Sequence, residues 1–357
     1  MRIIITPFSL GRRGQGGRGK KNKYYMEYRT LGKSEVKVSE LAFGAWAIGG
    51  WMWGGADSKE AIEAIETAVD HGMTTIDTAA VYGFGLSEEI ICKAIKGKRS
   101  KVQILTKFGL TWNEKKGEFY FASVDNAGKD VSIYRYSAKE KVISDCDQSL
   151  KRLGTDYIDL YQIHWADPTT PVSETMEALD LLVTKGKIRA GAVCNYSLEL
   201  MEEAEKTFPI ASNQVPYSMV NRSIEKDIMP HCIERNIGIL AYSPLQRGLL
   251  TGKISIEHKF NAGDTRPNTI YYKEPNLSRI LLLTNNLKEI ANERKVTLSQ
   301  LVLNWTMQQP GISCTLAGER NAAQVLDNVK AAGFHLSKDE VNNINDLLAN
   351  LKIETKV

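Results

Sequence analysis

Residues 41–50 read Leu-Ala-Phe-Gly-Ala-Trp-Ala-Ile-Gly-Gly, and they decide between two α/β folds. The first four, residues 41–44, predict a short buried strand. An open doubly wound sheet carries a glycine-rich phosphate-binding turn after its first strand. The turn after Gly44 is too apolar and aromatic for that task. The stretch therefore favours a closed barrel over an open sheet.

The next segment predicts a helix that leads into a second strand. Asp57 and Glu60 form a D-x-x-E capping pair, in which the first carboxylate accepts the N-terminal amides and the second reaches back. Apolar residues follow at helical spacing at positions 61, 62, 65, 68 and 69, and Gly72 stands where a left-handed C-cap is expected. Together with residues 74–78 these segments complete one β–α–β unit.

The same alternation runs through the rest of the chain. The strand candidates are residues 41–44, 74–78, 103–108, 157–164, 190–195, 212–215, 238–243 and 314–318. Further helical stretches cover residues 87–96, 138–152, 173–185, 198–206, 225–236, 279–294 and 321–331. Eight such units without an intervening linker predict a single-domain (β/α)8 TIM barrel, an α/β fold. Two long connections, residues 110–136 and 246–277, follow the third and seventh strands, on the side where barrel active sites lie.

Charge and composition restrict the classes of function. The 357 residues include 46 Lys and Arg against 42 Asp and Glu. Seven of the basic residues and no acidic one lie in residues 1–25, so the remainder is slightly acidic, which argues against a nucleic-acid-binding body. No stretch is apolar enough to span a membrane. The five cysteines and five histidines are scattered, which predicts no metal site and a reducing, cytoplasmic compartment.

The amino-terminal segment contains a motif that does not fit its surroundings. Residues 14–19 spell G-x-G-x-x-G, a dinucleotide-binding fingerprint that has meaning only between a strand and a helix. A short apolar run precedes it and a lysine-rich stretch without helical period follows. We interpret residues 1–25 as a disordered basic extension, or an upstream translation start, and residues 26–357 as the barrel.

Four polar residues lie at or just after the carboxyl ends of consecutive predicted strands. Asp77 ends the second strand, Lys107 the third and His164 the fourth, and Tyr82 lies in the turn after Asp77. Singly, these are an ordinary turn aspartate, a solvated lysine and a structural histidine. Their occurrence on three neighbouring strands beside a tyrosine favours a catalytic group at the barrel mouth.

This set suits the protonation of an alkoxide. The pKa of tyrosine lies near 10, so the phenol exchanges its proton poorly at neutral pH unless its anion is stabilised. A nearby ammonium such as Lys107 stabilises a phenolate, and Asp77 keeps that lysine charged in a partly dry site. His164 can form a hydrogen bond to a carbonyl and orient it. No serine–histidine or cysteine–histidine nucleophile pair stands out.

These motifs carry a resemblance to a known family. Residues 77–83 read Asp-Thr-Ala-Ala-Val-Tyr-Gly and are followed by Ser87 and Glu88, which resembles the D-T-A-x-x-Y-G-x-x-x-S-E signature of the aldo-keto reductases. Residues 105–107 and 159–165 are similar to the lysine and histidine motifs of that family, and residues 185–189 and 242–245 extend the match. The similarity runs from about Tyr28 to beyond Ala331. The nearest branch is that of the bacterial general stress and inositol-operon reductases, which also resemble potassium-channel β-subunits.

The resemblance implies NADPH-dependent reduction of aldehydes or ketones, with Tyr82 as general acid and base, Lys107 and Asp77 tuning its pKa, and His164 orienting the carbonyl. It also implies a cofactor lying across the barrel mouth, with NADPH favoured over NADH because Arg320, and as a second candidate Arg266, would pair with the 2′-phosphate. The implied cofactor-binding residues are Gly44 and Trp46 at the mouth, Asn195 and Gln214 at the carboxamide, Tyr242 at the nicotinamide ring, Ser243, Leu245, Gly248 and Leu249 at the pyrophosphate, and Gly318, Arg320, Gln324, Asp327 and Asn328 at the adenosine end.

Two positions depart from the family pattern. Cys194 stands where serine is usual, and Asp327 where glutamate is frequent, so either change is expected to weaken cofactor binding. The catalytic set is untouched. A cleft for an apolar carbonyl substrate is expected to draw on Trp46, Trp51, Trp53, Trp112 and Trp165.

Two other functions stay open from the sequence. One is a channel-β-like regulatory subunit, which would bind cofactor but turn over slowly. The other is a phosphate-handling barrel enzyme such as an isomerase or aldolase, which would need a glycine-rich phosphate turn and a carboxylate or Schiff-base lysine as principal actor.

Overall fold

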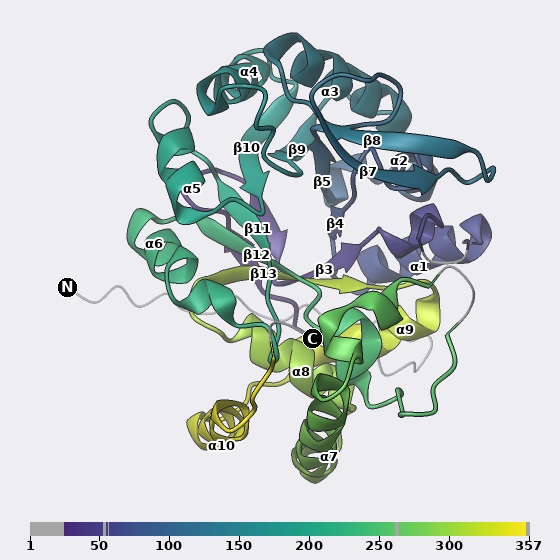
Figure 1. The fold of residues 1–357 in the computed structure, drawn as a ribbon, viewed down its shortest axis with the longest axis vertical. Coiled ribbons are helices and arrows are strands. Elements are labelled where there is room, and N and C mark those ends of the chain that lie inside the picture. The colour runs from purple at the N-terminus through teal and green to yellow at the C-terminus, as the bar shows by residue number, and fades with distance from the viewer. Residues whose placement is uncertain (1–24, 53–54, 56, 261–263, 355–357) are drawn as a thin grey trace, which may run out of the picture.

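A closed barrel of eight parallel strands forms the centre of the molecule, in a computed structural model that describes residues 25–52, 55, 57–260 and 264–354. The strands are β3 (Leu41–Gly44), β4 (Thr75–Asp77), β5 (Gln103–Phe108), β9 (Ile158–Ile163), β10 (Ile188–Cys194), β11 (Ser212–Pro216), β12 (Gly238–Tyr242) and β13 (Ile312–Gly318). They pair in sequence order, and β13 closes the barrel against β3. Figure 1 shows the helices surrounding these strands. The predicted TIM barrel is confirmed.

Helices lie on the outside of the barrel, between the strands and after the last one. They are α1 (Ser58–Asp70), α2 (Leu86–Ala94), α3 (Lys139–Leu153), α4 (Val172–Thr184), α5 (Leu198–Glu205), α6 (Ile228–Arg235), α7 (Asn276–Arg294), α8 (Leu298–Met307), α9 (Ala322–Asn328) and α10 (Lys338–Ala349). The Asp57 half of the predicted capping pair is confirmed at the start of α1, since its side chain accepts from the backbone amides of Lys59 and Glu60. Gly72 follows its end with a left-handed φ of 88°.

The barrel interior is filled by side chains that alternate along the strands, as a period of two requires. These inward residues include Ala42, Leu105, Leu160, Ala192, Leu240, Cys314 and Leu316. An amino-terminal hairpin that the sequence analysis missed, β1 (Tyr28–Thr30) and β2 (Lys37–Ser39), adds Leu31, Val36 and Val38 to the same cluster. The hairpin therefore packs against the interior core of the barrel.

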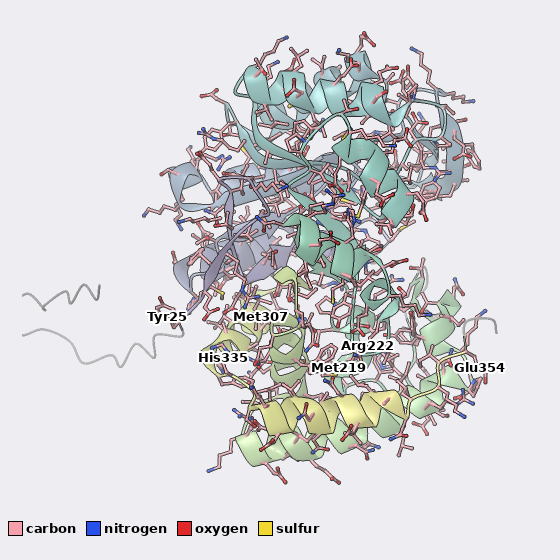
Figure 2. All side chains as sticks on the ribbon, turned by 90° about the vertical axis from the view of Figure 1, so that its left-hand side faces the viewer. Tyr25, Met219, Arg222, Met307, His335 and Glu354 are labelled. Atoms are coloured by element: carbon pink, nitrogen blue, oxygen red, sulfur yellow. The ribbon has the colours of Figure 1, made fainter. Side chains whose placement is uncertain are left out.

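Two further helices were also missed. Every residue of α8 is buried, so the helix shows no polar face and no amphipathic period by which sequence could reveal it. Helix α10 comes after the eighth unit and packs on α7. In the side view of Figure 2, α10 (yellow) runs along the molecule from the end near His335 and Tyr25 toward the end that carries Glu354. None of the helices in the described part of the chain is long and apolar enough to cross a membrane.

The two long connections have defined structures. Residues 110–136 form a small antiparallel sheet of β6 (Leu110–Thr111), β7 (Glu118–Val124) and β8 (Asp130–Arg135), which stands at the rim of the barrel in Figure 1. The connection after β12 contains short 3-10 turns at Gln246–Thr251, Arg266–Asn268 and Ile270–Tyr272. Both connections follow the carboxyl ends of strands and contribute side chains to one cleft.

Candidate active site

The four predicted catalytic residues meet at the carboxyl ends of β4, β5 and β9. Lys107, in β5, donates from Nζ to Asp77 Oδ2 at 2.6 Å and to the carbonyl of Thr78 at 2.8 Å. Its Nζ lies 5.1 Å from the ring centroid of Tyr82. The rings of Tyr82 and His164 meet edge to face with centroids 5.7 Å apart. The Lys107 side chain is 1% exposed, so its ion pair with Asp77 is screened very little by solvent.

A second set of polar side chains fixes the aspartate. Asp77 Oδ1 accepts from Gln214 Nε2 at 2.8 Å and from Gln162 Nε2 at 3.4 Å. Cys194 Sγ lies 3.7 Å from Gln162 Oε1. Gln162 was not among the predicted site residues, although the period of two along β9 placed it on the same face as His164. Both oxygens of Asp77 are thus held by hydrogen bonds.

Burial decides the protonation of this group. Burial raises the pKa of Tyr82 to about 12, and the charge of Lys107, which lowers it, does not compensate. Burial alone would lower the pKa of Lys107, but Asp77, Tyr82 and Cys194 together outweigh it and raise that pKa. Burial and then the charge of Lys107 hold the pKa of His164 well below its usual value. At neutral pH the phenol is therefore protonated, the ammonium charged and the imidazole uncharged.

The serine and glutamate of the signature motif support the turn that carries Tyr82. Ser87 Oγ bonds with Thr78 Oγ1 at 2.8 Å and donates to the carbonyl of Ala45 at 3.0 Å. Glu88 is fully buried and accepts from Thr106 Oγ1 and Arg152 Nε, both at 2.6 Å. These bonds connect the start of α2 to β5 and α3. Ser87 and Glu88 therefore hold the turn in place.

A single cleft of about 990 Å³ begins at this group and runs across the barrel mouth. It is lined by most of the predicted cofactor residues, namely Gly44, Trp46, Asn195, Gln214, Tyr242, Ser243, Leu245, Gly248, Arg266, Gly318, Arg320, Gln324, Asp327 and Asn328. Tyr82, His164 and Asp77 line it as well. Lys107 and Leu249 instead lie buried beneath its surface. Gly44 is required for packing, because a Cβ there would lie 2.9 Å from the carbonyl of Ala317.

Near Tyr82 the cleft wall is held by Asn195. This residue adopts a left-handed φ of 58°, which asparagine tolerates better than most residues. Its Nδ2 donates to the carbonyl of His164 at 3.1 Å, and its Oδ1 accepts from the Tyr242 hydroxyl at 3.0 Å. The amide and the tyrosine ring are thereby fixed side by side in the cleft wall.

The turn after β12 has an unusual backbone. Ser243, Gln246, Arg247 and Gly248 all have positive φ, of 56°, 47°, 55° and 99°. Each non-glycine residue in this region costs roughly 1–3 kcal/mol, so the surrounding structure must stabilise it. Ser218 Oγ donates to Gln246 Oε1 at 2.9 Å and anchors the turn. The amides of Gln246 and Gly248 donate to the carbonyls of Ser243 and Leu245, which closes the turn against the cleft.

Arginines gather at the far end of the cleft. Arg247, Arg266 and Arg320 all line it. The backbone amide of Arg320 donates to Gln324 Oε1 at 2.8 Å. Asp327 is engaged by α8, since Gln300 Nε2 donates to its Oδ1 at 2.6 Å. Asn328 Nδ2 donates to Glu319 Oε1 at 2.9 Å. The arginines make this end suitable for a phosphate group.

Aromatic side chains enclose the opposite end. Trp51, Tyr120, Phe121 and Trp165 line the cleft there, and Trp51 Nε1 donates to Ser123 Oγ at 2.9 Å, which ties β7 to the turn after β3. Of the other predicted tryptophans, Trp46 packs on Tyr82 with ring centroids 6.1 Å apart, and Trp112 contacts Phe84 at 5.5 Å. Trp53 lies outside the described residues.

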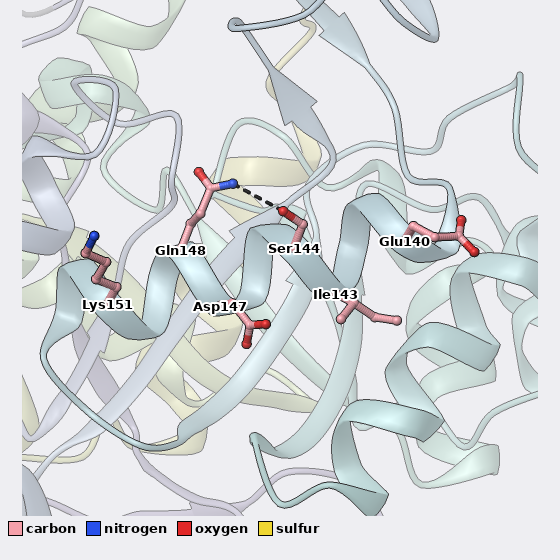
Figure 3. Close-up of a pocket in the computed structure, with 6 residues that line it drawn as sticks. All are labelled: Glu140, Ile143, Ser144, Asp147, Gln148 and Lys151. Carbon is pink, nitrogen blue, oxygen red and sulfur yellow. Dashed lines mark hydrogen bonds between the residues drawn. The ribbon is translucent and has the colours of Figure 1, made fainter.

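A second depression, of about 500 Å³, lies on the surface of α3 and contains none of the predicted site residues. Figure 3 shows side chains of this one helix, among them Ser144 and Gln148, which share a hydrogen bond of 3.4 Å. In the described part of the chain, no cluster of three or more His, Cys, Asp or Glu could hold a metal ion.

The closed barrel, the buried Asp77–Lys107 pair beside Tyr82 and His164, and the cleft that ends in arginines together define a barrel oxidoreductase of the nicotinamide-dependent class. Residues 40–349 match the model of the Aldo/keto reductase family, and the chain belongs to that family. It is an NAD(P)H-dependent oxidoreductase, and the enzymes of this family act on small-molecule carbonyl substrates.

Three similar proteins support this assignment. The chain is 38% identical to aldo-keto reductase YhdN of Bacillus subtilis over 91% of this chain and 94% of that protein. It is 32% identical to the NADH-specific methylglyoxal reductase of Escherichia coli, over 87% of this chain and 95% of that protein. The solved structure of the glycerol dehydrogenase AKR11B4 from Gluconobacter oxydans superposes with a TM-score of 0.82 at 34% identity, covering 92% and 98% of the two chains.

Proposed function

We propose that this protein reduces aldehydes or ketones to alcohols with NADPH, and that Tyr82 is the general acid. The observation that carries the proposal is the buried ion pair of Lys107 and Asp77, which lies against a protonated tyrosine beside an uncharged histidine. NADPH, when bound, supplies the hydride. The residues of the chain then have to bind the carbonyl compound, stabilise the charge that develops on its oxygen and deliver a proton to it.

Tyr82 and His164 share the work at the carbonyl oxygen. The Tyr82 hydroxyl donates to that oxygen and gives up its proton as negative charge develops there. Because an alkoxide is a stronger base than a phenolate, a pKa of about 12 does not prevent the transfer. His164 is uncharged, so it orients the oxygen through a hydrogen bond and leaves the proton transfer to Tyr82. Lys107, fixed by Asp77, stabilises the phenolate that remains.

The cleft residues are assigned to the cofactor according to their places. Asn195 and Gln214 would hold the carboxamide, and Tyr242 would cover the nicotinamide ring. Because Gln214 Nε2 already donates to Asp77, its Oε1 is the atom that would accept from the carboxamide. The left-handed turn at residues 243–249 would hold the pyrophosphate, and Arg320 with Arg266 the 2′-phosphate. Gln324, Asp327 and Asn328 would surround the adenosine, with Gly318, Gly44 and Trp46 along the cleft wall.

The experiment is a fluorescence titration of the purified protein with NADPH and with NADH, followed by rate measurements on a panel of carbonyl compounds. We expect tighter binding of NADPH and multiple turnovers with at least one aldehyde. Tight cofactor retention with very slow turnover on the whole panel would instead support a channel-β-like regulatory subunit. Failure to bind either cofactor would contradict the proposal outright.

Two further proposals concern the chain as a whole. We propose that residues 1–25 are an extension that the barrel, residues 26–357, does not need, because Tyr25 is 81% exposed whereas Met26 is 7% exposed and packs in the core. We also propose a cytoplasmic location, because all five cysteines are free thiols.

A further inference from the structure

The turn that carries Arg266 also carries a carboxylate bound directly to it. Asp264 Oδ1 accepts from the backbone amide of Arg266 at 2.9 Å, and its two oxygens accept from Arg266 Nε at 3.1 and 3.0 Å. Arg266 Nη2 donates to Asp264 Oδ2 at 2.6 Å. The carboxylate therefore binds one edge of the guanidinium. The Arg266 side chain is 22% exposed and the Asp264 side chain 15% exposed. A paired geometry of this kind fixes the plane of the guanidinium as well as its position.

Asp264 lies among cations. Burial lowers the pKa of Arg320, and the charge of Arg266 lowers it further, whereas Asp264 opposes both. The pKa of Arg247 is likewise lowered by burial, with Asp264 opposing and Arg266 adding to the effect. The Arg266 guanidinium thus repels both Arg247 and Arg320 at the cleft. The carboxylate of Asp264 offsets part of that repulsion for each of them.

Neighbouring hydrogen bonds hold the same segment over the cleft. The carbonyl of Arg247 accepts from the Tyr272 hydroxyl at 3.1 Å and from Arg266 Nη1 at 3.4 Å. Arg247 Nη2 donates to Thr265 Oγ1 at 2.9 Å. Side chains of Thr265, Arg266 and Tyr272 therefore join this segment to Arg247. Asp264 accepts a hydrogen bond of 2.6 Å from the Arg266 guanidinium, which also contacts the Arg247 carbonyl and the Phe260 ring.

We infer that Asp264 is a positioning residue for cofactor selectivity: it holds Arg266 at the cleft against the repulsion of Arg247 and Arg320, in the orientation that receives a 2′-phosphate. The inference rests on the proposed function. A phosphate monoester carries about −1.5 to −2 charges at pH 7, so it would nearly neutralise three guanidiniums and one carboxylate. NADH carries a hydroxyl at that position and gains nothing from a fixed Arg266. Asp264 therefore increases the difference in binding affinity between NADPH and NADH.

Asp264 could also act in the opposite direction and weaken NADPH binding. A carboxylate close to the site also repels the phosphate, and if that repulsion dominated, removal of Asp264 would tighten NADPH binding. The two effects have opposite signs, so one variant separates them. For Asp264→Ala we expect NADPH to bind about 10-fold more weakly or worse, in the range that loss of one charge-assisted hydrogen bond produces, with NADH changed less than about 2-fold.

The test is a set of dissociation constants measured by fluorescence or calorimetry on wild type, Asp264→Ala, Arg266→Ala and the double variant. The ligands are NADPH, NADH, 2′,5′-ADP and 5′-AMP, of which the last two probe the adenosine end without any turnover. If Asp264 acts through Arg266, the double variant binds 2′,5′-ADP no more weakly than Arg266→Ala does. Asp264→Asn, which keeps one acceptor oxygen, should fall between wild type and Asp264→Ala.

A matched control removes an exposed aspartate from another ion pair. Asp70, the last residue of α1, has its Oδ1 3.8 Å from Lys98 Nζ, and its side chain is 67% exposed. Asp70→Ala should therefore leave the dissociation constants of all four ligands unchanged within error. Tighter binding of NADPH by Asp264→Ala, an equal loss for NADPH and NADH, or an additive double variant would each overturn the inference. A wild-type protein that binds neither NADPH nor 2′,5′-ADP would instead overturn the proposed function, so the two failures are distinguishable.

Discussion

The two ends of the cleft differ in how far their charged side chains are buried. At the catalytic end one ammonium and one carboxylate form a fully buried pair, fixed further by Gln214 and Gln162. At the arginine end, Arg266 is partly buried and Arg320 is exposed, and Asp264 is paired with Arg266. A buried pair is scarcely screened, so it sets protonation states firmly, whereas the open cluster is tunable by salt and by single substitutions. The proposed catalytic group and the proposed phosphate-binding arginines therefore lie in different dielectric surroundings.

The largest effect is expected at the catalytic end. Tyr82→Phe preserves the ring that packs on Trp46 but removes the proton donor. Since general acid catalysis contributes about 10²–10⁴-fold, kcat should fall by that factor while the dissociation constant for NADPH stays nearly unchanged. Steady-state kinetics and a cofactor titration check both statements. A variant that keeps more than about a tenth of the wild-type rate would remove Tyr82 from its role.

The buried ion pair should also show in stability. Lys107→Met leaves Asp77 buried with only amide partners, and breaking one side of a buried pair costs about 3–5 kcal/mol of unfolding free energy. Lys187→Met, at an exposed pair with Asp147, is the matched control and should cost less than about 1 kcal/mol. Urea unfolding midpoints measure the two. Equal losses would mean that burial does not distinguish these pairs.

At the arginine end the expected effect is smaller and depends on salt. The double variant Arg320→Ala with Arg266→Ala should weaken NADPH binding by about 10- to 150-fold and leave NADH nearly untouched. Added salt should reduce the wild-type preference for NADPH, because these side chains are partly open to solvent. The same salt series on the kcat of the reaction at saturating cofactor should show little change. A double variant that prefers NADPH as strongly as its parent would place phosphate recognition elsewhere.

The pKa of Tyr82 predicts how rate depends on pH. Burial raises this pKa to about 12, so the folded protein keeps the phenol proton at pH values where a free tyrosine loses it. Carbonyl reduction, which needs the protonated form, should be flat from pH 6 to 9 in single-turnover measurements. The reverse oxidation needs the phenolate, so it should rise about tenfold per pH unit over the same range. An acidic limb near pH 6.5 would indicate that His164 titrates, contrary to its burial.

The sequence predicted the barrel because each strand–helix unit carries its own period and caps. It predicted Asp77, Lys107 and His164 because each lies at the end of an apolar run. What it missed has physical causes. Helix α8 is buried on all sides and so lacks a periodic signal, and β1 with β2 is too short to show one. The hydrogen bonds between Asp264 and Arg266 form only in the folded turn, whose conformation residue spacing alone does not specify.

The smallest effect is expected from deletion of residues 1–25, which belong to neither end of the cleft in our proposal. The first described strands, β1 and β2, join the barrel-interior core, and Met26 packs beside Gly72. Residues 1–25 contain no apolar period that would connect them to it. Deleting them should therefore leave the melting temperature, the NADPH dissociation constant and kcat unchanged within error. The deletion removes seven positive charges, so the salt series described for the arginine end is the sensitive control. If the tail contributed to cofactor attraction, the shortened protein would show a weaker salt dependence of NADPH binding, and the arginine end would then extend beyond the cleft itself.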